Sequence, residues 1–94
     1  MTVFAVRYTY DARAALRDQV RPEHRTFLGT LYGGALLASG PLADDGAPGA
    51  LLIVTAASPE QAAALLDQDP FAQAGLIAAR EIRAWTQVYG PWST

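Results

Sequence analysis

The 94-residue sequence has no cysteine, no lysine and only one histidine. No disulfide or thiolate chemistry is therefore available, and the fold is indifferent to the redox compartment. One histidine without cysteine leaves too few ligands for a typical zinc site, and Asp44-Asp45-Gly46 lacks the ligand spacing of a calcium loop. The glycine patterns of dinucleotide-binding and P-loop proteins are also missing. We therefore expect no metal ion and no cofactor.

Charge is scarce and nearly balanced. Seven arginines face nine acidic side chains, which gives a net charge of −2, and the arginines are scattered along the chain. Without a basic stripe to neutralise phosphates, we expect no nucleic-acid role. The sequence also lacks a secretory signal pattern and any apolar stretch of membrane-spanning length. We therefore expect no membrane association and a cytoplasmic location.

The composition is typical of a globular protein, with 51% hydrophobic and 17% charged residues. Residues 1–94 are long enough for one domain that buries a modest core without a disulfide or a structural metal. We expect a single domain.

Hydrophobic periodicity predicts four strands and two main helices. Residues 3–10 alternate as a half-buried strand, and Asp11 is positioned to cap a helix that runs to about Tyr32. Pro22 must kink that helix or break it. Ser58-Pro59-Glu60 has the capping residue, first-turn proline and first-turn acid of a helix start. The remaining expected elements are strands over 35–39, 50–55 and 79–89, a helix to about residue 67 and a helical turn after Pro70.

The order βαββαβ is that of the ferredoxin-like fold, an α+β arrangement in which a four-stranded antiparallel sheet carries its helices on one face. The other face then needs cover. On the last strand it is expected to carry a mixture that suits an interface better than bulk water, namely Arg83, Trp85, Gln87 and Tyr89. We therefore expect a homodimer.

His24 is the natural centre of any acid-base chemistry, because an imidazole has an unperturbed pKa of roughly 6.5. If the first helix is continuous, His24 points inward, four residues after Val20 and four before Leu28. Asp69 is the partner that would fix the tautomer of the ring. Each residue also has a structural interpretation: His24 as a core residue bonded to a backbone carbonyl, and Asp69 as the N-cap of the turn after Pro70.

Ser39-Gly40-Pro41 ends the second strand and could add a hydroxyl and an approachable backbone to the same pocket. Ordinary turn chemistry explains this segment equally well. No nucleophile-elbow pattern surrounds Ser39, so the sequence argues against a serine hydrolase.

The chain resembles the YCII-related (YciI-like) family over nearly its whole length. The residues that carry the resemblance are Arg21-Pro22-Glu23-His24, Leu36-Leu37-Ala38-Ser39-Gly40-Pro41, Asp69-Pro70-Phe71, Ala74-Gly75-Leu76 and Glu81-Ile82-Arg83-Ala84-Trp85. The resemblance implies a fold of the dimeric α+β barrel superfamily and an active-site pocket built on a histidine and an aspartate, which match His24 and Asp69. It places Ser39-Gly40-Pro41 beside them. The departures are the alanine-rich helices and the segment Tyr89-Gly90-Pro91-Trp92.

By analogy with related folds, such as muconolactone isomerases and small cofactor-independent monooxygenases, we expect a small organic, possibly aromatic-derived, substrate with an acidic C–H or a leaving group. His24 would move the proton and Asp69 would orient His24. Arg7 or Arg83 would hold an anionic substituent if their faces line the cleft. The alternative is a non-catalytic ligand-binding or interaction module, in which a structural His24–Asp69 bond ties the first helix to the exit of the second.

Overall fold

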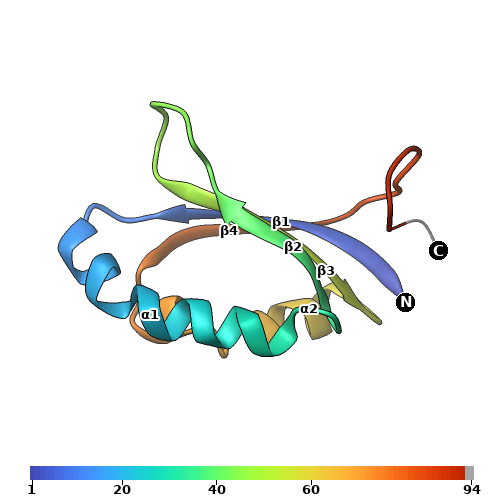
Figure 1. The fold of residues 1–94 in the computed structure, drawn as a ribbon, viewed down its shortest axis with the longest axis horizontal. Helices are drawn as coiled ribbons and strands as arrows, with labels where there is room; N and C mark the ends of the chain where they lie inside the picture. The colour runs from blue at the N-terminus through green and yellow to red at the C-terminus, as the bar shows by residue number, and fades with distance from the viewer. Residues whose placement is uncertain (93–94) are drawn as a thin grey trace.

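In the computed structural model, which describes residues 1–92, a four-stranded antiparallel sheet carries its helices on one face (Figure 1). The strands lie side by side in the order β2-β3-β1-β4. Along the chain the elements are β1 (Thr2–Tyr10), α1 (Ala14–Leu31), β2 (Leu36–Pro41), β3 (Gly49–Ala56), α2 (Pro59–Leu66), α3 (Pro70–Gln73) and β4 (Ile77–Ala84). This arrangement confirms the ferredoxin-like fold, and α3 is the helical turn predicted after Pro70.

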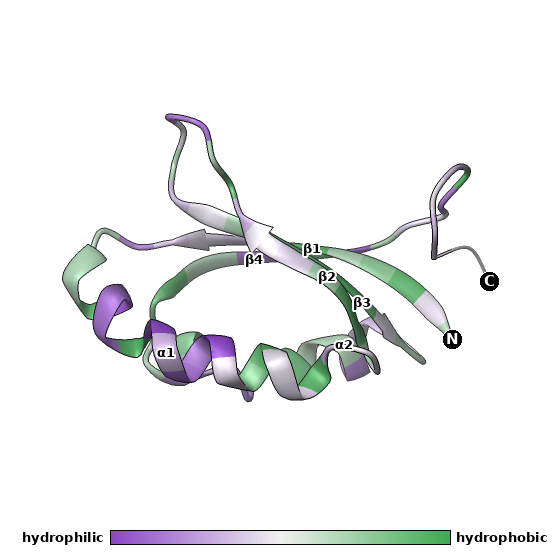
Figure 2. Cartoon of the chain, in the orientation of Figure 1, coloured by the Kyte–Doolittle hydropathy of each residue, from purple (hydrophilic) through white to green (hydrophobic). Residues whose placement is uncertain are grey.

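The core lies between the sheet and the helices. Phe4, Val6 and Tyr8 alternate along β1 toward the helices and are almost fully buried. The register with β3 places their partners on the same face. Figure 2 shows green along parts of β1 and β3, and both purple and green in α1, as expected for a helix that packs on one side only. Each large apolar side chain buried here contributes about 1.5–3 kcal/mol.

α1 continues through Pro22 without a break. Proline lacks the N–H that would bond to the carbonyl of Asp18, and such a position bends a helix. In Figure 1 the first turns of α1 are inclined to the rest. Asp11 does not cap this helix: its carboxylate accepts from the backbone N–H of Arg13, before the helix begins. Neither α1 nor any other helix within residues 1–92 has the length and hydropathy needed to cross a membrane.

β4 is shifted toward the N-terminus relative to the predicted strand over 79–89. It begins at Ile77 and ends at Ala84, which pairs with Phe4 of β1, and one further hydrogen bond joins the Trp85 N–H to the Val3 carbonyl before the chain leaves the sheet. Gln87 and Tyr89 therefore lie beyond the sheet, and the prediction that they share its second face is wrong.

The face of the sheet opposite the helices is only partly covered. Leu51 and Trp85 are 44% and 39% exposed there. Trp92 packs edge-on against Trp85, with 6.4 Å between ring centroids, so the C-terminal segment turns back along this side. The connection between β2 and β3 also rises on this side of the sheet (Figure 1).

We predict that Ser58→Ala lowers the free energy of unfolding by about 1 kcal/mol, because the Ser58 hydroxyl accepts a hydrogen bond from the backbone N–H of Gln61 at the start of α2. Ser58→Asp, which keeps an acceptor, is the control and should stay close to wild type. Urea unfolding followed by circular dichroism measures both. Equal stability of the alanine variant and wild type would contradict the capping role.

Candidate functional site

His24 and Asp69 meet in the core, although they lie 45 positions apart in the sequence. His24 comes from the buried side of α1, and Asp69 lies immediately before α3. Nδ1 of His24 is 2.7 Å from Oδ1 of Asp69. The predicted contact between these two side chains is therefore present.

The carboxylate of Asp69 is fully buried and has three hydrogen-bonding partners from three elements. Oδ1 accepts from the backbone N–H of Phe71 at 2.9 Å in addition to contacting His24. Oδ2 accepts from the hydroxyl of Tyr8 at 3.1 Å. Asp69 thus caps α3 and contacts the imidazole at once. Sequence reasoning missed Tyr8; the only available signal was a hydroxyl on the core face of a strand, which needs a partner when buried.

This geometry fixes the tautomer and the plane of the imidazole. Because Oδ1 of Asp69 is an acceptor, Nδ1 of His24 is the donor, and the neutral ring then has its lone pair on Nε2. The ring stacks on Phe71, with centroids 3.9 Å apart and planes 10° apart. Tyr10 packs edge-on against the same phenyl ring. The imidazole is therefore held on its Nδ1 edge and on one face.

The opposite edge of the imidazole reaches a pocket of about 200 Å³. No residue within 1–92 hydrogen-bonds to Nε2, and no buried side-chain nitrogen or oxygen in that range lacks a partner, so Nε2 is open to the pocket. The lining residues are Tyr10, Arg21, His24, Arg25, Leu28, Ser39, Gly40, Pro41, Ala50, Leu52 and Phe71. The expected neighbours Ser39, Gly40 and Pro41 do lie beside His24, because β2 is the edge strand next to α1.

Arg7 and Arg83 do not line this pocket. The register pairs Arg7 with Glu81 and Ala5 with Arg83, which places both arginines on the sheet face away from the helices. Their proposed role in holding a substituent beside His24 is therefore wrong, because the sheet separates them from it. The arginines at the pocket are Arg21 and Arg25.

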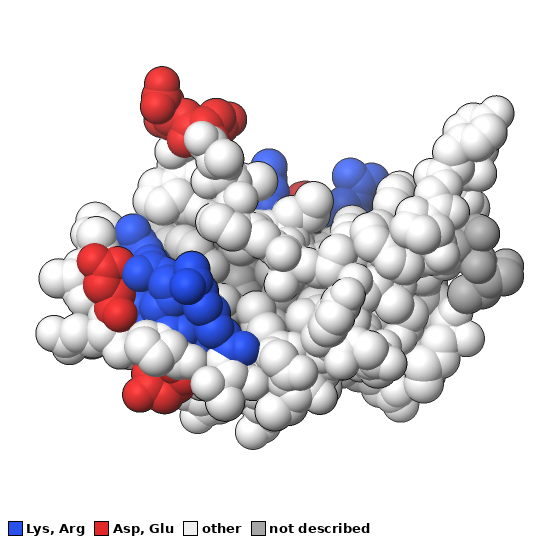
Figure 3. Space-filling view, in the orientation of Figure 1, with Lys and Arg blue, Asp and Glu red and all other residues white. Residues whose placement is uncertain are grey.

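The description of the arginines as scattered also needs correction. Arg17, Arg21 and Arg25 recur at every fourth position on one side of α1, and Arg13, four residues before Arg17, immediately precedes this helix. Figure 3 shows the resulting basic patch over α1. The four-residue spacing was visible in the sequence, but it becomes a ridge only because the helix continues through Pro22.

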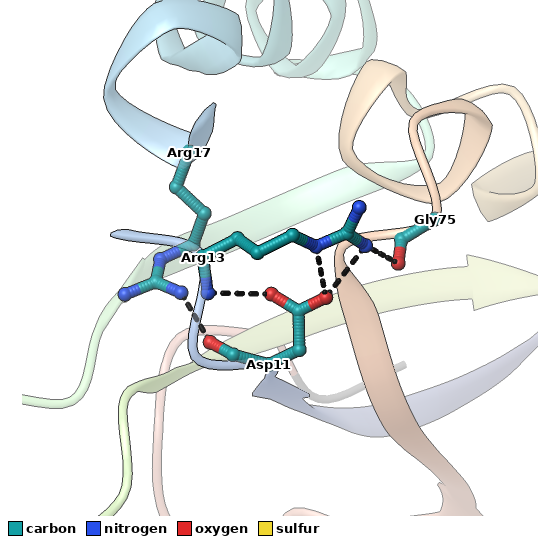
Figure 4. A network of polar contacts seen from close by, with 4 residues as sticks. All are labelled: Asp11, Arg13, Arg17 and Gly75. Carbon is teal, nitrogen blue, oxygen red and sulfur yellow. Dashed lines mark hydrogen bonds and ion pairs between the residues drawn. The ribbon is translucent and has the colours of Figure 1, made fainter. Parts of the chain in front are cut away.

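A polar network at the start of α1 holds the site together (Figure 4). The Arg13 guanidinium donates to the carboxylate of Asp11 and to the backbone carbonyl of Gly75, just after α3. Arg17 donates to the backbone carbonyl of Asp11. The turn from β1 to α1 is thereby tied to the turn from α3 to β4. This connection keeps the helix that carries His24 beside the one that Asp69 caps.

Two tyrosines at the site strongly favour their neutral forms. Burial, followed by the charge of Asp69 and the hydrogen bond to it, raises the pKa of Tyr8 far above its ordinary value. Burial and the charge of Asp69 raise the pKa of Tyr10 to about 12, against the opposing charges of Arg17 and Arg21. Tyr8 therefore remains a donor to Asp69 at any working pH.

His24 and Asp69 can carry out acid-base chemistry without a metal ion or a cofactor. The imidazole can take a proton at Nε2, and the carboxylate behind it stabilises the imidazolium that results. Within residues 1–92, His, Cys, Asp and Glu side chains form no group of three that could hold a metal ion.

The raised pKa of Tyr10 predicts a loss of stability at alkaline pH. Because the folded state favours the neutral phenol, this contribution is complete below pH 10 and disappears as the pH rises from 10 through about 12. The free energy of unfolding should fall less steeply over this range in Tyr10→Phe than in wild type. The difference between the tyrosinate absorbance titrations of the two proteins should have a midpoint near 12. A midpoint near 10 would contradict the assignment.

The comparisons with known proteins agree with this fold. A model of the YCII-related domain matches residues 1–86. Among solved structures, the chain is similar to 5-chloro-2-hydroxyhydroquinone dehydrochlorinase from Burkholderia phenoliruptrix AC1100, in complex with 2,5-dihydroxybenzoquinone. The sequence identity is 24%, the TM-score is 0.79, and the match covers 89% of this chain and 93% of that one. Comparison with curated proteins gives no match. Because the family model spans nearly the whole sequence, the chain belongs to the YCII-related family.

Proposed function

We propose that the protein is a cofactor-independent enzyme, a lyase or isomerase, that moves a proton on a small organic substrate. The observation that carries this proposal is the orientation of His24: Nδ1 faces a fully buried carboxylate, and Nε2 faces a pocket. A ring needed only for packing gains nothing from an open nitrogen, whereas a general base requires one. His24 is the proposed base, and Asp69 positions it.

The proposed reaction balances without an oxidant or a reductant. Nε2 of His24 takes a proton from an acidic C–H or O–H of the substrate, and the released electron pair forms a new π bond. In an elimination, the leaving group departs with its bonding electrons, and the imidazolium gives its proton to water. In an isomerisation, the imidazolium returns the proton to a different carbon. Asp69 keeps the same hydrogen bond throughout.

The pocket lining supports an unsaturated, ring-shaped substrate. Phe71, Leu52 and Tyr10 supply apolar and aromatic surface next to His24. Ser39, Gly40 and Pro41 also line the pocket, and we propose that they contact the substrate. The pocket volume of about 200 Å³ lies below the usual range for drug-sized ligands, which favours a small molecule.

The similar dehydrochlorinase suggests the first compound to test. Its name describes the loss of hydrogen chloride from a chlorinated hydroxyquinol, which is an elimination of the kind proposed above. At 24% identity the likeness shows the fold alone, so 5-chloro-2-hydroxyhydroquinone is a starting point for a substrate screen, to be tested beside its non-halogenated analogue.

A structural role for the pair has its own supporting observation. Both oxygens of Asp69 are occupied by protein donors, and one of these bonds caps α3. A non-catalytic binding module would need the same contacts. The two interpretations predict different effects on turnover and stability when the charge of Asp69 is removed and the shape of its side chain is kept.

We predict that Asp69→Asn and His24→Gln each lower kcat/KM by about 100-fold or more on a substrate found by the screen. Asparagine still caps a helix, and its amide can bond to Tyr8, so the fold should survive while the carboxylate behind His24 is lost. Asp67→Asn is the matched control. It also replaces an aspartate with asparagine, but at an exposed carboxylate that is paired with Arg80. Stopped assays of chloride or product release measure turnover.

Thermal and urea unfolding of the same variants separate catalysis from folding. The catalytic interpretation expects His24→Gln to lose about 1 kcal/mol of stability or less. If both site variants lose about 3 kcal/mol or more and turnover does not fall below that of Asp67→Asn, the pair is structural.

We also propose a homodimer formed through the sheet face that carries Leu51 and Trp85. A cytoplasmic location and the absence of a nucleic-acid partner remain predictions from the sequence. Sedimentation velocity should give a molecular mass of twice the 10.0 kDa of the chain. A structure of the dimer should show a total buried surface of roughly 1,200 Å² or more.

Leu51→Glu should convert this dimer to a monomer, because an unpaired carboxylate at the centre of an interface is costly to desolvate. Tyr32→Glu, on an exposed residue at the end of α1, is the control that should stay dimeric. A wild-type monomer at high micromolar concentration, or a dimer unaffected by Leu51→Glu, would rule out this interface.

A further inference from the structure

The charge of the pocket wall is one-sided. Two arginines, Arg21 and Arg25, line the pocket, and no aspartate or glutamate does. Asp69, the nearest carboxylate, lies behind the imidazole, where three protein donors already occupy it. A chain with a net charge of −2 thus places two cations and no anion around its open histidine nitrogen.

The two arginines sit on either side of His24 along α1. Residues four apart lie on the same side of a helix, and their Cβ atoms are about 5–6 Å apart. Arg21 and Arg25 can therefore approach one ligand from the same wall. In Figure 3 a basic patch lies over α1, and all its atoms are arginine because the chain has no lysine.

Neither arginine is committed to a strong internal partner. Arg25 forms no ion pair with any residue in 1–92, and the only partner of Arg21 in that range is Asp18. The side chain of Asp18 is 69% exposed, so this pair is screened by water and is easily exchanged for a ligand. By contrast, Arg13 and Arg17 on the same ridge are bonded to Asp11 and hold the fold. Arg13 and Arg17 therefore have a structural role, whereas Arg21 and Arg25 are available to a ligand.

We propose that Arg21 and Arg25 form an anion-binding subsite at the mouth of the pocket, so that the ligand is a small organic anion with a flat apolar body. Its carboxylate or ionised hydroxyl would bind the guanidinium groups, with its body against Phe71 and Leu52 and its acidic hydrogen toward Nε2 of His24. This assignment deepens the proposed function and rests on it for the reacting hydrogen, but not for binding.

The same arginines would assist the proposed proton transfer. When the proton leaves, negative charge grows on the substrate, and guanidinium groups already in place stabilise it without reorganising. The apolar walls of the pocket strengthen this effect by lowering the local dielectric. Arg21 and Arg25 thus take over the role that the sequence suggested for Arg7 and Arg83.

Binding of unreactive ligand pairs tests the subsite. Benzoate, 2-hydroxybenzoate and 4-hydroxybenzoate are each compared with the corresponding amide by isothermal titration calorimetry, because carboxylate and amide have nearly the same shape. On wild type, at least one carboxylate should bind about tenfold or more tightly than its amide. Arg21→Gln and Arg25→Gln should each reduce this preference by about fivefold or more, with little change in amide binding. Added salt should weaken only the carboxylates.

Arg83→Gln is the matched control, since it removes the same charge on the other face of the sheet. It should keep the preference for carboxylates. Equal affinity for acids and amides overturns the subsite, as does an equal loss in all three variants or no carboxylate binding at millimolar concentration. His24→Gln separates the two proposals. If this variant keeps the preference for carboxylates and the substrate screen finds no turnover, the anion-binding subsite is supported and only the proposed enzymatic function is contradicted.

Discussion

The rest of the site depends on one buried charge. Asp69 is fully enclosed, and a carboxylate removed from water is tolerated only when donors replace its hydration. The three donors come from β1, α1 and the first turn of α3, in the form of Tyr8, His24 and the backbone N–H of Phe71. Moving any of these elements would leave the carboxylate short of a partner. The sheet, the long helix and the short helix are therefore held in one relative position by the group that the proposed chemistry uses.

This coupling explains why the structural and catalytic interpretations of the pair are so hard to separate. Oδ1 of Asp69 caps α3 and orients the imidazole with the same atom, and the ring it orients is stacked on Phe71, the residue whose N–H completes the cap. An imidazole held in this way loses little freedom when a substrate arrives, which is how a positioned base gains its advantage. The contacts that stabilise the fold are then the same contacts that prepare the base.

The order of elements followed from residue patterns, whereas the site required information that patterns do not contain. Alternation in β1 and the capping signal at Ser58 were sufficient to place that strand and the start of α2, because burial and caps are local properties. The end of β4 was missed because it depends on where pairing with β1 stops, which the alternation of residues 79–89 does not contain. Residue chemistry suggested Asp69 as the partner of His24, and the family resemblance supported this pairing, since nothing local joins residues 45 positions apart. Arg7 and Arg83 were wrongly assigned to the pocket because it forms on the helix side of the sheet, whereas both arginines lie on the other face.

The arginine ridge shows how the sign of a local field can differ from that of the whole chain. Net charge describes long-range attraction, whereas recognition depends on the few groups that line a low-dielectric pocket. Here no acid lines the pocket, Asp69 lies behind the imidazole, and α1 brings to the pocket wall two arginines, of which Arg21 is paired with the exposed Asp18. In the proposed reaction the positive charge develops on the imidazole beside Asp69, and the electrons remain beside Arg21 and Arg25. The charges that separate during the reaction therefore each meet an opposite charge that the fold has already fixed in place.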